Sequence, residues 1–367
     1  MIATSHVAVI GGGIGGLTTA LALAMQGASV CVYEQASALK EVGAGIQITP
    51  NGARVLNALG LQDALDRNGL RAEAVVPTNG LTGRAVTRFD LSGQTPPYRF
   101  IARADLIGLL ADACTKRGVD LVLNHRIDDL PTGDLVIGAD GIRSQIRGRL
   151  NSQSQARFTG QVAWRAVVAA RDTPEARIYM LPGRHVVTYP LPGGRLNIVA
   201  VQERSDWAAE GWHHPDDPAN LRAAFADGCG SLQKLLMQVE APLLWGLFRH
   251  PVAPVWVSDN VALVGDAAHP TLPFLAQGAN LALEDSLILA RLLARHGIAA
   301  GLPRYEALRK PRVARAIAAA NANAVNYHLG GVRRRVAHLG LAALGRAAPG
   351  AFIRRLDWLY GYDAGAV

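Results

Sequence analysis

The N-terminal forty residues alternate short apolar runs with glycine-rich breaks. Residues 7–10 are continuously apolar, which is typical of a strand buried on both faces of a parallel sheet. Residues 14–26 then repeat apolar side chains at helical spacing, and Gly27 is suited to end that helix. A second apolar run follows at residues 29–33. The pattern therefore predicts a strand–helix–strand unit at the start of the chain.

Later parts of the chain show two different patterns of apolar and polar residues. Strand-like runs that lead into a turn or a helix recur at residues 100–114, 134–147 and 260–293. Residues 71–97 and 156–254 instead contain short β-rich runs separated by Pro-Gly and Gly-Gly turns, which predict one sheet. From about Leu302 onward the pattern is helical. We therefore expect an α/β protein in which a β-rich region interrupts the first domain.

Composition narrows the class of protein. Half of the 367 residues are hydrophobic and 18% are charged, as in a globular α/β enzyme. The formal net charge is +8, but the arginines are scattered, and their longest run is Arg333, Arg334 and Arg335. No basic stripe interleaved with aromatic residues accompanies them, so we expect no nucleic-acid partner. Attraction of anionic cofactors and substrates explains the charge more simply.

The cysteines and the hydropathy of the chain indicate in which cellular compartment we expect the protein. The three cysteines, Cys31, Cys114 and Cys229, form no CxxC pair and have no metal-ligand spacing, so we expect reduced thiols and no metal site. The N-terminus lacks a basic flank, and nowhere do eighteen apolar residues follow one another. We expect a cytoplasmic protein that neither enters the secretory route nor spans a membrane.

The first glycine-rich break carries the spacing GxGxxG, at Gly11, Gly13 and Gly16, with Ile14 and Gly15 inside it. Such glycines allow a tight turn, close approach to a pyrophosphate, and close packing of the helix on the strand. Glu34 ends the next strand 18 residues beyond Gly16, where an acid suits a ribose hydroxyl. The motif favours an adenine dinucleotide over a plain strand–helix turn.

Residues 40–60 then bring a second glycine-rich loop and a helix starting near Asn51, rather than the next strand of a nicotinamide dehydrogenase. Two further motifs follow: the Asp-Gly pair at Asp140 and Gly141, and GDAAHP at residues 265–270. Taken in this order, the motifs resemble those of the single-component FAD-dependent aromatic hydroxylases, the flavoprotein monooxygenase family that includes salicylate hydroxylase and 3-hydroxybenzoate 6-hydroxylase. The resemblance spans nearly the whole chain.

The resemblance implies a fold and a domain arrangement. We expect a Rossmann-like FAD-binding domain with an inserted β-sheet substrate domain and a C-terminal helical segment. The FAD-binding domain would comprise residues 1–70, 98–155 and 255–300, the substrate domain 71–97 and 156–254, and the helices 301–367. The basic and apolar C-terminal helices would cover the flavin domain or form a dimer contact, rather than touch a membrane. Either a monomer or a homodimer is expected.

The resemblance also implies cofactor contacts. Asp266 would accept a hydrogen bond from the flavin's ribityl chain, and the helix starting at Gly278, Ala279 and Asn280 would face its pyrimidine edge. Arg103 would lie near the flavin or its pyrophosphate. Asp140 would serve both the cofactor phosphates and the passing nicotinamide. Since no second GxGxxG is present, NADH or NADPH should dock only transiently. Further residues expected to line the cofactor are Gln35, Gly45, Ile46 and Ile127.

The run RHVVTYPL supplies the candidate substrate residues. Alternation along a strand places His185, Val187 and Tyr189 on one face. His185 and Tyr189 are similar in spacing to a His and Tyr that line the phenol site in a member of the family, so His185 is a candidate to deprotonate or orient a phenol, against the alternative of a structural histidine. Two departures from the family, Pro273 and Ala276, put the substrate's identity in doubt.

Three more residues are weaker candidates. Trp164 is considered as a wall of the substrate pocket, against the alternative that it packs in a core. Arg184 or Arg195 could pair with a substrate carboxylate only if its side chain turned inward.

The activity implied is hydroxylation of a phenol or hydroxybenzoate by O₂ and NAD(P)H through a flavin C4a-hydroperoxide. A flavin-dependent reductase or halogenase on the same fold is one alternative, although the segment QVAWRAVV lacks the WxWxIP signature of halogenases. A flavin-binding sensor without turnover is another, because a fold alone does not fix a function.

Overall fold

The N-terminal apolar runs form the centre of a six-stranded sheet in the computed structural model, which describes residues 2–39, 45–152, 156–205 and 214–367. The strand order is β16-β17-β9-β1-β2-β8, parallel except for the edge strand β16. Its strands are β1 (His6–Ile10), β2 (Ser29–Tyr33), β8 (Asp120–Val122), β9 (Leu135–Gly138), β16 (Val257–Ser258) and β17 (Val261–Leu263).

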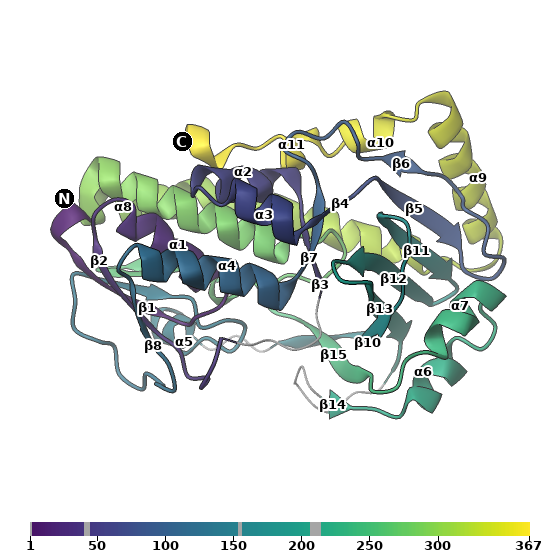
Figure 1. Ribbon diagram of the computed structural model, residues 1–367, viewed down its shortest axis with the longest axis horizontal. Helices are drawn as coiled ribbons and strands as arrows, with labels where there is room; N and C mark the ends of the chain where they lie inside the picture. Colours follow the sequence, from purple (N-terminus) through teal and green to yellow (C-terminus); the bar gives the residue numbers. More distant parts are fainter. Residues whose placement is uncertain (1, 40–44, 153–155, 206–213) are drawn as a thin grey trace.

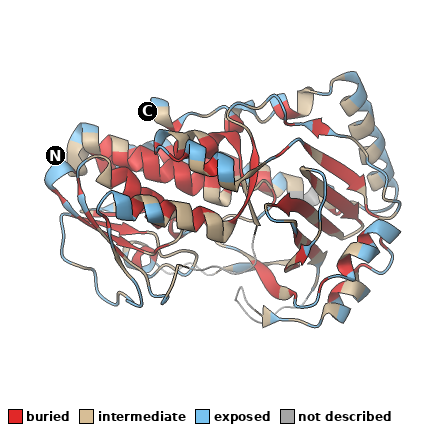
Figure 2. Cartoon of the chain, in the orientation of Figure 1, coloured by how far each residue is buried: buried red, intermediate tan, exposed pale blue. Residues whose placement is uncertain are grey.

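Helices cover this sheet and complete the first lobe of the molecule (Figure 1). Helix α1 packs against both α4 and α8, and residues 280–293 of α8 are buried except Arg291 (Figure 2). Helix α8 bends away from helical geometry at Gly297, where φ is 72°, and then continues. The helices are α1 (Ile14–Ala24), α2 (Pro50–Ala58), α3 (Gln62–Asn68), α4 (Arg103–Lys116), α5 (Gln145–Leu150) and α8 (Gly278–Tyr327).

Two expected features bear on these helices. The helix expected near Asn51 is α2, whereas most of the glycine-rich loop expected before it lies outside the described residues. The boundary expected after residue 300 lies three residues beyond Gly297, where the backbone leaves helical geometry between the two helical parts of α8.

An eight-stranded sheet forms the second lobe, in the order β14-β15-β10-β13-β12-β11-β5-β6. One face packs on α6 (Pro218–Ala224) and α7 (Gly230–Leu236) in a separate apolar core. The strands come from two stretches of sequence, which supports the proposed insertion of a substrate domain. They are β5 (Ala74–Asn79), β6 (Phe89–Asp90), β10 (Arg157–Ala169), β11 (Glu175–Leu181), β12 (Arg184–Leu191), β13 (Arg195–Glu203), β14 (His214–Pro215) and β15 (Leu243–Arg249).

A small antiparallel sheet and the C-terminal helices join the two lobes. The small sheet contains β3 (Gly45–Ile48), β7 (Arg99–Ala102) and β4 (Leu70–Arg71). The chain then runs from the second lobe back to the first through α9 (Gly331–Ala347), α10 (Ala351–Arg354) and α11 (Asp357–Tyr360), as Figure 1 shows. Within the described part of the chain, no helix has both the length and the apolarity that crossing a membrane requires.

Candidate active site

The GxGxxG turn contains two kinds of glycine. Gly11 and Gly16 are required by the backbone geometry, whereas Gly13 borders open space. Gly11 has a φ of 109°, and a Cβ on Gly16 would lie 1.9 Å from the carbonyl oxygen of Gly11, so both positions require glycine. A Cβ on Gly13 would meet nothing within 4 Å. Gly13 is also the N-cap of α1, where backbone amides without helical partners attract anions. The turn therefore fits a pyrophosphate group.

A groove of about 280 Å³ begins at this turn and runs beneath the second sheet. We call it the glycine-lined groove. Its walls come from the β1–α1 turn, β3, the start of α4, the loop after β17 and the N-terminus of α8. The two helix N-termini and the Arg103 side chain suit a cofactor with negative charge. The expected cofactor residues that line the groove are Gly13, Ile14, Gly15, Gly45, Ile46, Arg103, Asp266, Gly278 and Ala279.

The other expected cofactor residues lie outside the groove's lining. The carboxylate of Glu34 accepts hydrogen bonds from the backbone amides of Gly12 and Ala36, at 2.6 and 2.8 Å. Asp140 caps α5, because its carboxylate accepts from the backbone amides of Gln145 and Ile146. Contacts of Glu34 and Asp140 with a cofactor therefore remain predictions. The remaining members of this set are Gly11, Gly16, Gln35, Ile127 and Asn280.

The side chain of Asn280 fastens α8 to the neighbouring chain instead of facing the groove. Its Oδ1 accepts from the amide of Thr49 at 3.1 Å, and its Nδ2 donates to the carbonyl oxygens of Gln47 and Ala276 at 2.9 and 2.7 Å. Only the backbone of Asn280 is thus placed to add to the N-terminal dipole of α8. The side chain instead fixes where that N-terminus lies relative to β3.

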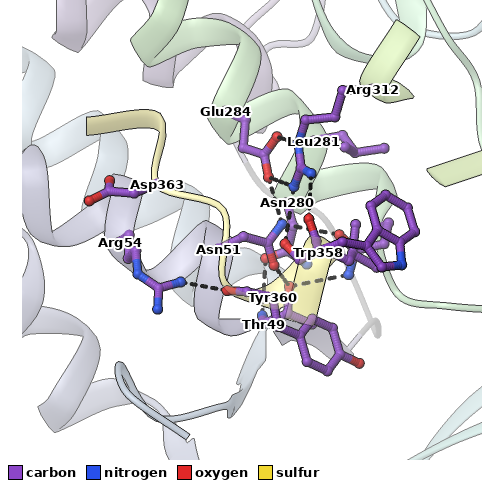
Figure 3. A network of polar contacts seen from close by, with 12 residues as sticks. Thr49, Asn51, Arg54, Asn280, Leu281, Glu284, Arg312, Trp358, Tyr360 and Asp363 are labelled. Atoms are coloured by element: carbon purple, nitrogen blue, oxygen red, sulfur yellow. Dashed lines mark hydrogen bonds and ion pairs between the residues drawn. The ribbon is translucent and has the colours of Figure 1, made fainter. Parts of the chain in front are cut away.

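A buried polar network holds the C-terminal segment against α8 (Figure 3). Arg312 donates to both carboxylate oxygens of Glu284, at 2.8 and 2.7 Å, and to the carbonyl oxygens of Trp358 and Leu359 at 3.0 Å. Arg54 donates to the carbonyl oxygen of Tyr360 from the other side. Since the side chain of Glu284 is fully buried, its ion pair with Arg312 offsets the cost of desolvating the carboxylate.

The loop GDAAHP is fastened to α8 by an adjacent acid. Asp285 accepts a hydrogen bond from the amide of Gly265 at 3.1 Å and from Arg309 Nε at 2.8 Å. Burial would raise the pKa of Asp285, but His269 and Arg309 oppose that effect and lower it to about 2. The carboxylate is therefore ionised at neutral pH. Asp266 and the first turn of α8 are positioned by this cluster.

A second cavity, of about 410 Å³, lies between the second sheet and the C-terminal helices. We call it the apolar cavity. Aromatic and aliphatic side chains dominate its lining, which suits a planar ring. It shares a wall with the glycine-lined groove, and the lining residues common to both are Gln47, His185, Val187, Pro273 and Ala276.

Strand β12 places the candidate substrate residues along this shared wall. His185, Val187 and Tyr189 all line the groove, as alternation predicts, while Val186 packs in the core on the opposite face. His185 and Val187 also line the apolar cavity, whereas Tyr189 does not. Burial, followed by the charge of His328, keeps the pKa of His185 well below its usual value, so the imidazole is neutral.

Three weaker candidates lie away from both cavities. Trp164 packs in the core behind the second sheet, with its Nε1 donating to Asp216 at 2.6 Å, so the pocket-wall interpretation is wrong. Arg184 pairs with Asp227 at 2.8 Å, and Arg195 pairs with Asp105 at 3.6 Å, so neither turns inward. Of the arginines in the described chain, the one that lines the apolar cavity is Arg355.

Sequence reasoning missed several residues of the groove. Arg165 and Val199 line it next to Val187, because β10 and β13 pair so that Arg165 faces Val199 and Val199 faces Val187. Only the register between strands reveals this, and no single strand carries that signal. Gln47, from β3, was also missed.

A glycine-rich dinucleotide groove that meets a buried apolar cavity beneath a β-sheet defines a flavin-dependent oxidoreductase. The family model described as "FAD binding domain" matches residues 4–133 and 132–320. The chain belongs to this family, and it is an FAD-dependent aromatic monooxygenase.

Characterised relatives cover almost the whole chain. It is 36% identical over 394 residues to a 3-amino-4-hydroxybenzoate 2-monooxygenase of Streptomyces platensis, covering 99% of this chain and 97% of that protein. It is 30% identical to 3-hydroxybenzoate 6-hydroxylase 1 of Aquipseudomonas alcaligenes, with 98% of each chain covered. Klebsiella pneumoniae HpxO complexed with FAD and uric acid superposes with a TM-score of 0.82 at 26% identity, covering 94% of this chain and 95% of that one. These relatives favour the monooxygenase over the reductase, halogenase and sensor interpretations.

Proposed function

We propose that this monooxygenase hydroxylates a small aromatic carboxylic acid that already carries a ring hydroxyl. The observation that carries the proposal is the shared wall, where buried His185 separates the glycine-lined groove from the apolar cavity. The names of the relatives support the same class, since they act on 3-amino-4-hydroxybenzoate, 3-hydroxybenzoate and 6-hydroxynicotinate. NADH or NADPH is proposed as the reductant.

His185 is proposed as the base that takes the proton of the ring hydroxyl. A neutral imidazole at the cavity wall can accept this proton, and the phenolate that forms is richer in electrons at the ring carbons than the phenol. Tyr189 lies four residues along the same strand face, about 13 Å away. Tyr189 lines the glycine-lined groove but not the apolar cavity. We therefore assign it to positioning the cofactor's ring system rather than to proton transfer.

FAD supplies the chemistry that accepts hydride from NAD(P)H and activates O₂ when it is bound. The residues of the chain hold and shield the reactants. The N-termini of α1 and α8 face the groove and favour negative charge there. Apolar side chains around the second cavity exclude water, and Arg355 at its lining is proposed to pair with the substrate's carboxylate.

NAD(P)H oxidation by the FAD-loaded protein tests the proposal. A panel should contain hydroxybenzoates, aminohydroxybenzoates and hydroxynicotinates, with unsubstituted benzoate as the matched control without a ring hydroxyl. We expect at least one phenolic acid to accelerate oxidation and to gain one oxygen atom by mass spectrometry. The proposal fails if no phenolic acid gains oxygen, and a substrate that is reduced without O₂ would indicate a reductase instead.

A further inference from the structure

A chain of three polar side chains leads from the shared wall to the protein surface. His185 Nδ1 lies 2.7 Å from His328 Nε2, and His328 Nδ1 lies 2.8 Å from Glu203 Oε1. His185 is 3% exposed, and the His328 and Glu203 side chains are 4% and 56% exposed. The chain therefore links a buried imidazole at the shared wall with a carboxylate in water.

The carboxylate fixes which ring nitrogens carry hydrogen. An ionised Glu203 can only accept, so His328 Nδ1 must carry the hydrogen and donate it. In a neutral imidazole the other nitrogen is then an acceptor, which means that His185 Nδ1 carries a hydrogen and donates to His328 Nε2. His185 Nε2 is thereby left with a lone pair. It has no hydrogen-bond partner among the described residues, although its ring lines both cavities.

We propose that His328 and Glu203 form a proton-exit relay for His185. The inference rests on the proposed function and deepens it. When the phenol O–H bond breaks, the proton forms a bond to His185 Nε2. The Nδ1 proton of His185 passes to His328 Nε2, and the Nδ1 proton of His328 passes to Glu203, which releases it to water. One proton enters the relay and one leaves, and no other reactant is needed.

The surroundings of the relay favour neutral imidazoles between turnovers. Burial lowers the pKa of His328, while Glu203 opposes that effect. Tyr327, whose ring centre lies 5.2 Å from that of His185, has a pKa raised by burial to about 12 and stays neutral. The other titratable or charged side chains that line the groove near β12 are Tyr189, Arg165, Arg103 and Asp266.

Proton release provides a readout that needs no turnover. A pH indicator can follow the oxidised FAD-loaded protein, without NAD(P)H, as it is mixed with a phenolic acid that the panel identifies as a substrate. We expect the wild-type protein to release close to one proton per bound phenol at pH 7, with a phenolate absorption band. Glu203→Gln and His328→Gln should release the proton at least about 10-fold more slowly at this pH, because the relay has lost its terminal acceptor or its middle carrier.

The relay variants should also show a characteristic change in steady-state kinetics. We expect Glu203→Gln to lower kcat about 10-fold to 100-fold at pH 7 with KM within about twofold. The deficit should shrink as the pH rises toward the phenol's own pKa near 10, because hydroxide then removes the proton. Imidazole in the buffer should restore part of the activity of His328→Ala, which a merely structural role would not predict.

Glu73→Gln is the matched control, since Glu73 has the same 56% side-chain exposure and lies outside the relay. It should keep wild-type kcat and proton release. The relay is refuted if Glu203→Gln and His328→Gln both retain the wild-type pH profile and the wild-type rate of proton release. If no phenolic acid is hydroxylated by the wild-type protein at all, the proposed function fails first, and the two results are thus distinguishable.

Discussion

His269 Nε2 lies 2.5 Å from Asp285 Oδ2, and both side chains are fully buried. The same carboxylate oxygen accepts the amide hydrogen of Gly265 at 3.1 Å. One acid in α8 therefore holds both ends of the loop that presents Asp266 to the glycine-lined groove. The histidine of GDAAHP acts in this fastening and not at the groove, because it does not line it.

Asp285→Asn should destabilise the fold and loosen the cofactor. The substitution removes a buried charge that Arg309 and His269 require, and breaking a buried pair typically costs about 3 to 5 kcal/mol. Urea unfolding of the FAD-loaded protein measures the first effect, and flavin fluorescence after dialysis measures the second. Asp227→Asn, at an ion pair whose acid is 54% exposed, is the control and should change stability by less than about 1 kcal/mol. Equal stability of the two variants would contradict this role.

The same carboxylate should make stability depend on acid pH. Its folded pKa of about 2 lies below its ordinary value of 3.8, so its contribution is complete above about pH 4 and is lost as the pH falls through 2. The free energy of unfolding should therefore drop by roughly 2 kcal/mol over this window on account of Asp285 alone. Urea unfolding between pH 2 and 5 checks it. Asp285→Asn lacks the titrating group, so parallel curves for the two proteins would sink the prediction.

Much of the fold follows from local patterns in the sequence. The apolar run at β1, the glycine turn and the apolar helix α1 are determined by neighbouring residues, so periodicity and spacing reveal them. The short β-rich runs similarly predict which segments of the chain form the second sheet. The kink of α8 at Gly297 also agrees with a local signal, because glycine is an ordinary sign of a helix end.

The site is less readable, because it is assembled from distant segments. Alternation correctly places His185 and Val187 on one face, since that property belongs to a single strand. His328 comes next to His185 only through packing over 143 residues of separation. The isolated motif NYHL carries no local signal for such a contact. The orientation of Trp164 has no local signal for the same reason, because which face of β10 meets the groove depends on sheet packing.

Gly13→Ala should separate cofactor binding from folding. Gly13 has a φ of −76°, which alanine adopts readily, and its added Cβ would project into open space. We expect a melting temperature of the apoprotein near that of the wild type, with FAD affinity lowered at least about 10-fold, or 1.4 kcal/mol. Gly16→Ala is the contrasting variant, because its Cβ would lie 1.9 Å from a backbone oxygen and should disrupt the fold itself. Unchanged FAD affinity in Gly13→Ala would refute the pyrophosphate assignment.

Arg312→Ala should uncouple NAD(P)H oxidation from hydroxylation. Arg312 binds the carbonyl oxygens of Trp358 and Leu359, and the adjacent Tyr360 lines the apolar cavity. Releasing this segment should admit water, so that a larger share of O₂ ends as hydrogen peroxide. The ratio of hydroxylated product to NAD(P)H consumed measures the effect. Arg315→Ala removes a guanidinium that stacks on Trp358 from an exposed position, and it should leave the ratio near that of the wild type.

Substitutions at Ala276 measure the backbone strain at the shared wall. Its φ is 54°, a left-handed conformation that costs alanine about 1 to 2 kcal/mol and glycine almost nothing. Ala276→Gly should therefore keep or raise the free energy of unfolding by up to about 1 kcal/mol, since the relief of strain outweighs the added freedom of the unfolded chain. Ala276→Val should lower it by about 1 to 3 kcal/mol, because a β-branched residue fits this conformation poorly. Urea unfolding compares both with Ala343→Val on exposed α9, which should cost less than about 1 kcal/mol. If Ala276→Val proves as stable as Ala343→Val, the left-handed conformation at this wall is wrong.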